Sequence, residues 1–489
     1  MASRFTALPL SSGESFILET DHGGKRWAIM LDGGQSKSEG PKKNKLYKAI
    51  RKHCPEITDR IDIAICTHRD HDHAGGFPAF IKTWLAEGNY IGEFWLPGGW
   101  AGAVEMALAN PDRLVSMLHE GARVAAYRIG ARERDIEPKT RESFREGTLR
   151  SIQSQMYDMC IEDSRSESPE EKPTFNRGLE DDRSADSSHK ARAANSWGFT
   201  TDDWEAIRSD LETSAIHGEP LADRARAYEQ LKSEMVVYET LFDDSSKRGH
   251  IVARRPFRDE TSDLQLARSL FHSAIDTAET IREIASTAVM FDIPVRWFDF
   301  AEFQRGAIPS GGIGGFLQPL NAVELRRVAR EADALSLFFK LALTEQNVAS
   351  LVFQRCETNA EPGAIFLGDS RLAFGIERPE TNFDKHLVQP TRPIVYTAPH
   401  HGSRNNDRAY DVLADWLPGL FETSIAVRNG GVWNQTLSEY LKVKNRRCAQ
   451  CHQCHGGNWS QLVQINSTGA DWTWPSDQGG KCGVPKRKN

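Results

Sequence analysis

Hydrophobic positions in the first hundred residues alternate between the spacing of strands and the spacing of helices. Apolar runs at 15–18 and 27–31 flank turn residues at 22–25, a pattern that predicts a hairpin. Residues 61–65 alternate as in a strand, whereas residues 77–85 are apolar at positions i, i+3, i+4, i+7 and i+8, as in an amphipathic helix. Strands followed by helices in this way predict an α/β fold.

The pattern changes twice further along the chain. Residues 101–290 contain no convincing strand, and an apolar stripe from 264 to 284 predicts a long helix, so we expect a mainly helical insertion. Within it, the stretch near 161–190 holds nine acidic, five basic and six serine residues, which predicts disorder. Strand-like runs return after it. We therefore divide the chain into 1–100 and 291–440, two halves of one sandwich-like domain, the insertion 101–290, and a tail at 441–489.

Composition narrows the class of protein. The chain has 489 residues, of which 39% are hydrophobic and 26% charged, and its mean hydropathy is −0.52, as expected for a soluble globular protein. No apolar run approaches the roughly 18 residues of a membrane helix, and the first residues lack the apolar stretch of a secretory signal. We expect a cytoplasmic protein that does not enter a membrane. The net charge of −7 means that any binding of nucleic acid needs a local basic patch.

The strongest chemical signal is a run of imidazoles and carboxylates that follows the predicted strand at 61–65. It contains His68, Asp70, His71, Asp72 and His73, and two glycines at 75 and 76 allow a tight turn into the next helix. Imidazole nitrogen and carboxylate oxygen are ligands that zinc, manganese and iron accept. The segment therefore predicts a metal site at the end of a strand.

This run resembles the metal-binding motif of the metallo-β-lactamase superfamily, His-x-His-x-Asp-His followed by x-Gly-Gly, with Asp70 at the place of the second histidine. The variant is similar to the hydrolase domain of the ComEC DNA-internalisation proteins and their soluble relatives. Four more segments resemble that branch in the same order along the chain: Asp32-Gly33-Gly34, the Asn-x-x-Ser-Leu-Val run at 347–352, Leu367-Gly368-Asp369, and the His-His-Gly-Ser turn at 400–403.

The resemblance implies an αβ/βα sandwich, interrupted by the insertion, and a set of functional residues. The implied metal ligands are His68, Asp70, Asp72, His73, Asp369, His400 and His401, with Asp72, His73 and Asp369 catalytic and Asp32 supporting the metal loop. Ser403, Arg404 and Asn405 follow closely enough to contact a phosphate, or are ordinary loop residues. Residues 317–319 and 427–431 lack histidines that the superfamily often has at these places, which tilts the site towards manganese relative to an all-histidine zinc site.

The C-terminal tail carries a second group of metal-type ligands. Cys448, Cys451, Cys454, His455 and Cys482 have the spacing of a structural zinc site, the alternative being reduced thiols without a metal. Basic residues lie before this group, at 442–447, and at the chain end, at 486–488. They could hold nucleic acid or form a solvated terminus.

Taken together, these features predict an enzyme, a metal-dependent hydrolase with one or two zinc or manganese ions. The favoured substrate class is a phosphodiester in nucleic acid or a nucleotide, attacked by a metal-activated water, so the protein would be a nuclease or phosphodiesterase. One alternative is a hydrolase of small esters, lactones or amides, because this fold supports many chemistries. Another is a subunit of a multi-protein complex, for example in bacterial defence, whose insertion docks a partner protein that gates activity.

Overall fold

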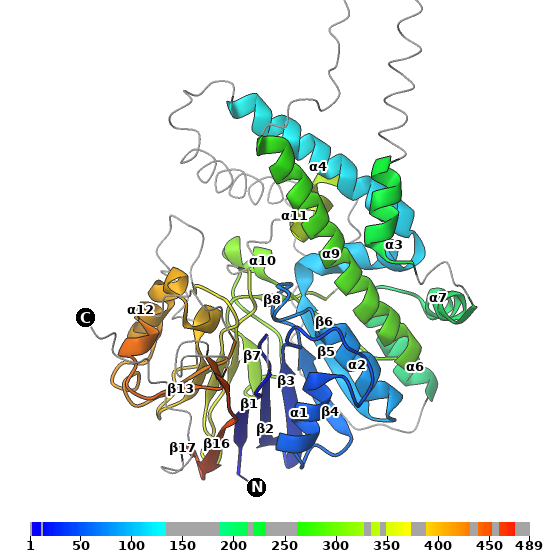
Figure 1. Ribbon diagram of the computed structural model, residues 1–489. Helices are drawn as coiled ribbons and strands as arrows, with labels where there is room; N and C mark the ends of the chain where they lie inside the picture. The colour runs from blue at the N-terminus through cyan, green and yellow to red at the C-terminus, as the bar shows by residue number, and fades with distance from the viewer. Residues whose placement is uncertain are drawn as a thin grey trace, which may run out of the picture.

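The computed structural model describes residues 2–10, 13–133, 186–213, 219–230, 262–326, 334–342, 349–372, 388–430, 439–451 and 459–474. Two mixed β-sheets lie side by side with helices around them, and a group of long helices extends from one end (Figure 1). The expected α/β class is thus confirmed. No described helix is long and apolar enough to cross a membrane.

The first sheet contains nine strands among the described residues, in the order β17-β16-β1-β2-β3-β4-β5-β6-β8. Strands β3 to β6 run parallel to one another, and the predicted hairpin joins β2 to β3 with His22 opposite Lys25. The bounds are β1 Arg4–Ala7, β2 Phe16–His22, β3 Lys25–Leu31, β4 Arg60–Ile65, β5 Tyr90–Pro97, β6 Val295–Asp299, β8 Val323–Glu324, β16 Val463–Thr468 and β17 Asp471–Thr473.

The second sheet contains six described strands, in the order β13-β12-β11-β10-β9-β7, with β10 to β13 parallel. The bounds are β7 Leu317–Pro319, β9 Phe353–Arg355, β10 Ala364–Phe366, β11 Val395–Thr397, β12 Ile425–Arg428 and β13 Arg446–Cys448. A short separate ladder pairs β14 Gln450–Cys451 with β15 Trp459–Ser460. Each parallel step needs a crossover connection, and α12 Asp407–Trp416 supplies the one between β11 and β12.

Alternation of side chains along the strands gives each sheet two apolar faces. Phe16 and Leu18 of β2 share one core cluster with Phe366 of β10 and Val395 of β11, so the two sheets pack face to face. The opposite face of the first sheet is covered by α1 Lys45–His53, α2 Phe77–Ala86 and α9 Ser262–Phe291, and that of the second by α10 Phe300–Gln304 and α12. The layers are therefore helix, sheet, sheet, helix.

Every described element of the insertion from 104 onward is an α-helix: α3 Val104–Ala109, α4 Pro111–Glu133, α6 Asp186–Ser196, α7 Thr201–Thr213 and α9. These helices share the core of the first sheet's helical layer, because Leu118 of α4 and Ile281 of α9 belong to the same cluster as Trp84 of α2. Helix α11 Ala334–Ala342, which follows the insertion in sequence, packs in this cluster as well. Of the stretch near 161–190 that was expected to be disordered, residues 161–185 lie outside the described residues, whereas residues 186–190 form the start of α6.

The tail contributes strands to both sheets, although the sequence suggested a separate unit at 441–489. Strand β13 extends the second sheet beside β12, while β16 and β17 extend the first sheet beside β1. Ile465 of β16 is fully buried between the sheets, opposite Phe5 of β1. The described part of the tail is thus built into the sandwich.

Candidate metal centre

The predicted metal-site residues lie on four loops, and each loop begins where a parallel strand ends. Asp32 follows β3, the 67–73 segment (the metal loop) follows β4, Asp369 follows β10, and the turn at 399–402 follows β11. The carboxyl ends of neighbouring parallel strands meet at one edge of a sheet, which is where α/β folds place their binding sites. The packed sheets bring both edges together, so all seven predicted ligands and Asp32 lie in one cluster.

Asp369 lies at the centre of this cluster. Its Oδ1 is 3.2 Å from His73 Nε2 and 3.9 Å from His401 Nε2. Its Oδ2 is 3.7 Å from His68 Nε2 and 3.6 Å from His400 Nε2. Two ligands on one tetrahedral ion at a bond length of ~2.1 Å lie about 3.4 Å apart. Each carboxylate oxygen therefore faces its own pair of imidazoles at a separation that fits metal coordination.

The remaining two carboxylates of the metal loop divide between these pairs. Asp72 Oδ2 lies 2.9 Å from His401 Nε2, and Asp70 Oδ2 lies 3.7 Å from His68 Nε2. In contrast, His71 is exposed and lines a neighbouring cavity instead of joining the cluster. The loop thus directs Asp70 and Asp72 towards different sides of Asp369.

His73 is held from behind by Asp32, as the resemblance implied. Asp32 Oδ2 lies 2.7 Å from His73 Nδ1, which leaves Nε2 facing the cluster. The same carboxylate accepts hydrogen bonds from the Thr67 amide and hydroxyl, each at 2.8 Å. A carboxylate behind a ligating histidine fixes the ring orientation and increases its basicity.

His401 has two supports that sequence reasoning did not find. Its Nδ1 lies 3.0 Å from Glu14 Oε2 and 2.7 Å from the carbonyl oxygen of Asn429. Glu14, His73 and His401 are close enough for a metal ion. However, Nδ1 of His73 already contacts Asp32, so Glu14 acts on the far side of the rings. The signal in the sequence was a charged residue directly before the first long apolar run, between Gly13 and Ser15.

His68 provides the clearest test of whether a metal fits. Its Nδ1 contacts the hydroxyl groups of Thr67 at 3.0 Å and Ser350 at 3.3 Å. Its Nε2 is buried and makes no hydrogen bond within the described residues, and the same is true of Asp369 Oδ1. An unsatisfied buried polar atom is costly. His68, His73 and Asp369 form a group that could hold an ion, and an ion between them would satisfy both atoms.

The electrostatics of the cluster favour added positive charge. Burial opposes ionisation of Asp369, but the charges of His73 and His401 outweigh it and hold the pKa of Asp369 well below its usual range. Burial likewise disfavours the charged imidazoles, yet Asp369 and the other carboxylates raise the pKa of His73 and His401 well above the usual range. A divalent cation can supply this charge in place of the two protons.

The histidine turn has an unusual backbone. His400 and His401 have φ of 47° and 51°, and Gly402 follows with φ of 77°. Left-handed conformations are unfavourable for residues with a Cβ atom. The turn is held in place by Arg428, a buried side chain whose Nε donates to the carbonyl oxygen of His401.

The predicted substrate-binding residues begin directly after this turn. Ser403 is buried, its amide donates to the carbonyl of His400 at 2.8 Å, and Arg404 is exposed. The side chain of Asn405 lies outside the described part of the chain. Its neighbour Asn406, not predicted, donates to the carbonyl oxygen of Asp369 at 2.6 Å. Of the two predicted substrate-binding residues whose side chains are described, Ser403 is thus buried and Arg404 exposed.

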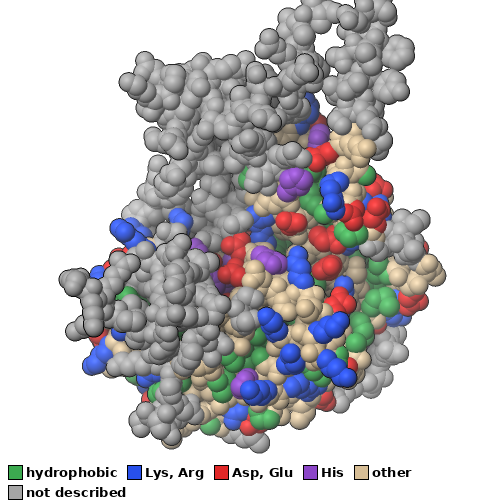
Figure 2. All heavy atoms as spheres, in the orientation of Figure 1, with side chains coloured by type: hydrophobic (Ala, Val, Ile, Leu, Met, Phe, Trp, Pro, Cys, Tyr) green, Lys and Arg blue, Asp and Glu red, His purple; other side chains and the backbone are tan. Residues whose placement is uncertain are grey.

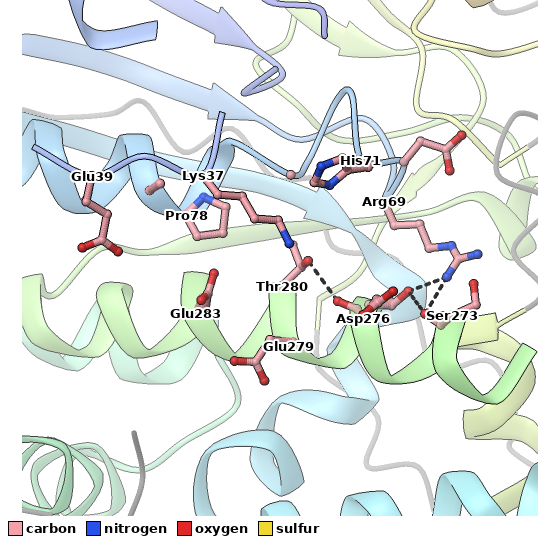
Figure 3. A pocket seen from close by; sticks show the side chains of 14 residues that line it. Lys37, Glu39, Arg69, His71, Pro78, Ser273, Asp276, Glu279, Thr280 and Glu283 are labelled. Carbon is pink, nitrogen blue, oxygen red and sulfur yellow. Dashed lines mark hydrogen bonds between the residues drawn. The ribbon is translucent and has the colours of Figure 1, made fainter. Parts of the chain in front are cut away.

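A cavity of about 310 Å³ adjoins the metal loop on the side of the insertion (Figure 3). Lys37, Arg69 and His71 line it from the loop side and Glu283 from α9, whereas the Glu279 side chain points to the other side of α9 and binds Arg282.

Arg69 connects the two walls of this cavity. Its Nη1 donates to the carbonyl oxygen of Ser273 at 2.7 Å and to the hydroxyl of Thr277 at 2.8 Å, both on α9. A residue between two predicted ligands thus joins the metal loop to the insertion.

The cysteine site of the tail is only partly within the described residues. Cys448 is buried, and its thiol donates to the carbonyl of Gln450 at 3.1 Å. Arg428 Nη1 lies 3.6 Å from its sulfur. The side chain of Cys451 and all of Cys454, His455 and Cys482 lie outside the described part, so the tail zinc site stays a prediction.

At the places of the two missing histidines, the described residues 317–319 and 427–430 place no further carboxylate or imidazole in the cluster. Gln318 donates to Gln354 Oε1 at 3.2 Å, and Asn429 contributes a backbone carbonyl behind His401. The assembled donor set is therefore four imidazoles and three carboxylates, which zinc and manganese both accept.

Fold and site together define an α/β sandwich with a buried His/Asp cluster able to hold a metal ion. No model of a known protein family matches the chain, and comparison with curated proteins also gives no match.

Proposed function

We propose that this protein is a metal-dependent hydrolase of the metallo-β-lactamase type that cleaves phosphodiesters. The observation that supports this most is the position of Asp369, whose two carboxylate oxygens each face a different pair of imidazoles. Such an arrangement suits a carboxylate that bridges two metal ions. The sequence of the metal loop and its resemblance to the ComEC branch support the same class.

The donor atoms divide into two sets around Asp369. A single ion would be held by His68, His73 and Asp369. Two ions would divide the donors, with His68, Asp70 and His400 on one side of Asp369 and Asp72, His73 and His401 on the other, and zinc or manganese are the candidates. When bound, such ions supply a water activated for attack near neutral pH and stabilise the charge that develops on the phosphoryl oxygens.

The protein's own groups orient this chemistry. Asp32 and Glu14 fix the rings of His73 and His401, so that both Nε2 atoms face the cluster. Asp72 is the most exposed of the central carboxylates, with about 36% of its side chain accessible. It is therefore placed to pass a proton between the cluster and solvent in addition to its role as ligand. Arg404 could contact a phosphate oxygen next to the histidine turn.

The first test is metal content per chain by elemental analysis, for the wild type, His68→Ala/Asp369→Ala and Cys451→Ser. We expect the double variant to lose the metal of the sandwich and the cysteine variant to lose at most one further zinc. The same proteins are then assayed on bis(p-nitrophenyl) phosphate, DNA and RNA with added zinc or manganese. If the wild type binds metal at the cluster but cleaves none of these, the phosphodiester assignment fails.

A panel of ester, lactone and β-lactam substrates separates the phosphodiester assignment from other hydrolases of this type. Activity on such a substrate that disappears in Asp72→Ala would transfer the assignment to a small-molecule hydrolase. If all metal follows Cys451 instead, the cluster is not a metal site in the isolated chain, and the hydrolase proposal is wrong for the protein alone.

A further inference from the structure

Helix α1 and the loop before it form a basic surface on a chain whose net charge is −7. Five exposed lysines make up this α1 lysine surface: Lys42, Lys43, Lys45, Lys48 and Lys52. Figure 2 shows Lys and Arg side chains gathering over the part of the molecule where α1 and α2 lie in Figure 1. Because the net charge is negative, binding of nucleic acid requires a local basic patch, and the α1 lysine surface is such a patch.

The folding of α1 does not explain the charges of Lys45 and Lys48. Leu46, Ala49 and Ile50 bury the inner face of the helix, whereas Lys45, Lys48 and Lys52 follow at i, i+3 and i+7 on the outside. Like charges at these spacings lower helix stability. The first turn contains no acidic residue, and Lys45 lies at the positive end of the helix dipole, whereas Lys52 lies in the last turn, where the dipole favours a cation. Charges that weaken their own helix indicate a role outside the fold.

Four of these lysines also have no counterion among the residues that the structure describes. Within the described residues, no ion pair is formed by Lys42, Lys43, Lys48 or Lys52. By contrast, neighbouring Lys82 faces Glu39 at 3.4 Å. Their ammonium groups are thus available to an anionic partner in solution.

The surface leads to the metal loop. The chain between them is short, because Lys37 lines the cavity beside Asp70 and α1 begins eight residues later. The loop is fixed on the way, since the Gly40 amide donates to the hydroxyl of Thr83 on α2 at 2.9 Å. The opposite wall of the cavity carries Glu279 and Glu283 of α9 (Figure 3). An anionic strand is attracted to the α1 side and disfavoured by Glu283, whereas the carboxylate of Glu279 already accepts hydrogen bonds from Arg282 and the Leu221 amide.

We propose that the α1 lysine surface binds the phosphate backbone of a nucleic-acid substrate and guides it past Lys37 to the metal centre. This inference rests on the proposed phosphodiester activity and names its substrate as a polymer. The rise from Lys45 to Lys52 is about 10 Å, the axial length of about three base-pair steps. The surface therefore contacts several phosphates and carries no base-specific readout.

The test measures binding separately from cleavage. A fluorescent single-stranded oligonucleotide is titrated with protein in EDTA, at several salt concentrations, for the wild type and Lys43→Gln/Lys48→Gln. The slope of log affinity against log salt should be less steep by about 1.4 in the variant, and binding at 0.1 M salt about 25-fold weaker. The matched control, Lys442→Gln/Lys444→Gln, removes the same formal charge from the basic segment before the cysteines and should bind as the wild type does.

A minimal substrate separates this inference from the proposed function. Hydrolysis of bis(p-nitrophenyl) phosphate should be equal in the wild type and Lys43→Gln/Lys48→Gln, because neither lysine contacts the metal centre, while KM for the oligonucleotide rises. If binding weakens in the lysine variant but the wild type cleaves no substrate, the α1 lysine surface is a nucleic-acid binding site and the proposed phosphodiester activity is wrong. The inference is overturned if the lysine variant binds the oligonucleotide as the wild type does, or if only the control variant loses binding. It is also overturned if the wild type binds phosphatidylserine vesicles but not the oligonucleotide. Circular dichroism and the single variant Lys48→Gln, with about half the change in slope, exclude a folding defect.

Discussion

The two carboxylates behind the metal-facing histidines should contribute unequally to metal binding. His401 Nδ1 has two acceptors, Glu14 Oε2 at 3.0 Å and the Asn429 carbonyl at 2.7 Å. His73 Nδ1 contacts Asp32 at 2.7 Å, and the next carboxylate among the described residues, Glu14, lies 3.9 Å away. Replacing Glu14 leaves Asn429 to hold its ring, whereas replacing Asp32 removes the close acceptor of His73.

The size of each effect follows from these contacts. Loss of a partner behind a ligating histidine costs roughly 10- to 100-fold in metal affinity, or about 1.4 to 2.7 kcal/mol. Glu14→Gln should lie near the lower value, because the carbonyl keeps the His401 ring in place. Asp32→Asn should lie near the upper value, because Asp32 also accepts from the amide and hydroxyl of Thr67, and an amide group would place a donor against one of them.

Competition with a fluorescent zinc or manganese chelator measures these affinities on the purified variants. Asp62→Asn is the matched control, since Asp62 is a buried carboxylate that pairs with Arg60 at 2.6 Å and Lys25 at 3.3 Å, away from the cluster. It should alter stability in urea but leave metal affinity unchanged. Equal losses in Glu14→Gln and Asp32→Asn, or wild-type affinity in Asp32→Asn, would refute the assignment of these roles.

Three further outcomes test the packing around the site. Gly13 and Gly24 both have positive φ, but a Cβ on Gly13 would lie 2.5 Å from a carbonyl of the metal loop, whereas a Cβ on Gly24 would meet nothing within 4 Å. In urea unfolding, Gly13→Ala should therefore lower the stability of the protein by at least about 1 kcal/mol more than Gly24→Ala does. Free zinc at 100 times its Kd should raise the free energy of unfolding by about 2.7 kcal/mol over protein in EDTA, an increment that Asp369→Ala should abolish. Thr277→Val removes the hydroxyl bonded to Arg69 and should cost about 1 kcal/mol in thermal or urea unfolding, whereas Thr280→Val, whose hydroxyl bonds only within α9, should cost less.

The clustering of the predicted ligands could be predicted because it follows from local sequence. Each predicted ligand lies directly after a short apolar strand, and the carboxyl ends of parallel strands converge regardless of what lies between them in sequence. Asp32 and Asp369 are separated by most of the chain, yet both lie beside His73. The helical pattern of α9 was visible for the same reason, since its apolar stripe has a simple period.

The supporting contacts could not be predicted, because they depend on how distant segments pack. Glu14 meets His401 across 387 positions of sequence, and nothing near Glu14 indicates its partner. Arg428 looked like a departure from a family pattern, but its side chain holds the carbonyl of His401. The place of the tail in the sheets could not be predicted for a related reason. Its cysteines suggested a zinc site at 441–489, and the pairing of β16, with Val463 and Ile465, to β1 joins the two far ends of the chain.

Backbone conformation gives an argument for function that is independent of any resemblance. Among the described residues, five that are not glycine have positive φ, and three of them, Asp32, His400 and His401, lie at the cluster. Each costs of order 1–2 kcal/mol relative to an ordinary conformation. Two hydrogen bonds that hold them, from Arg428 to the His401 carbonyl and from the Asp32 amide to the Ile65 carbonyl, do not require the side chains to be histidine or aspartate. Strained backbone positions of this kind cluster at binding and catalytic sites. Their coincidence with the His/Asp cluster supports the proposal that it binds a cation.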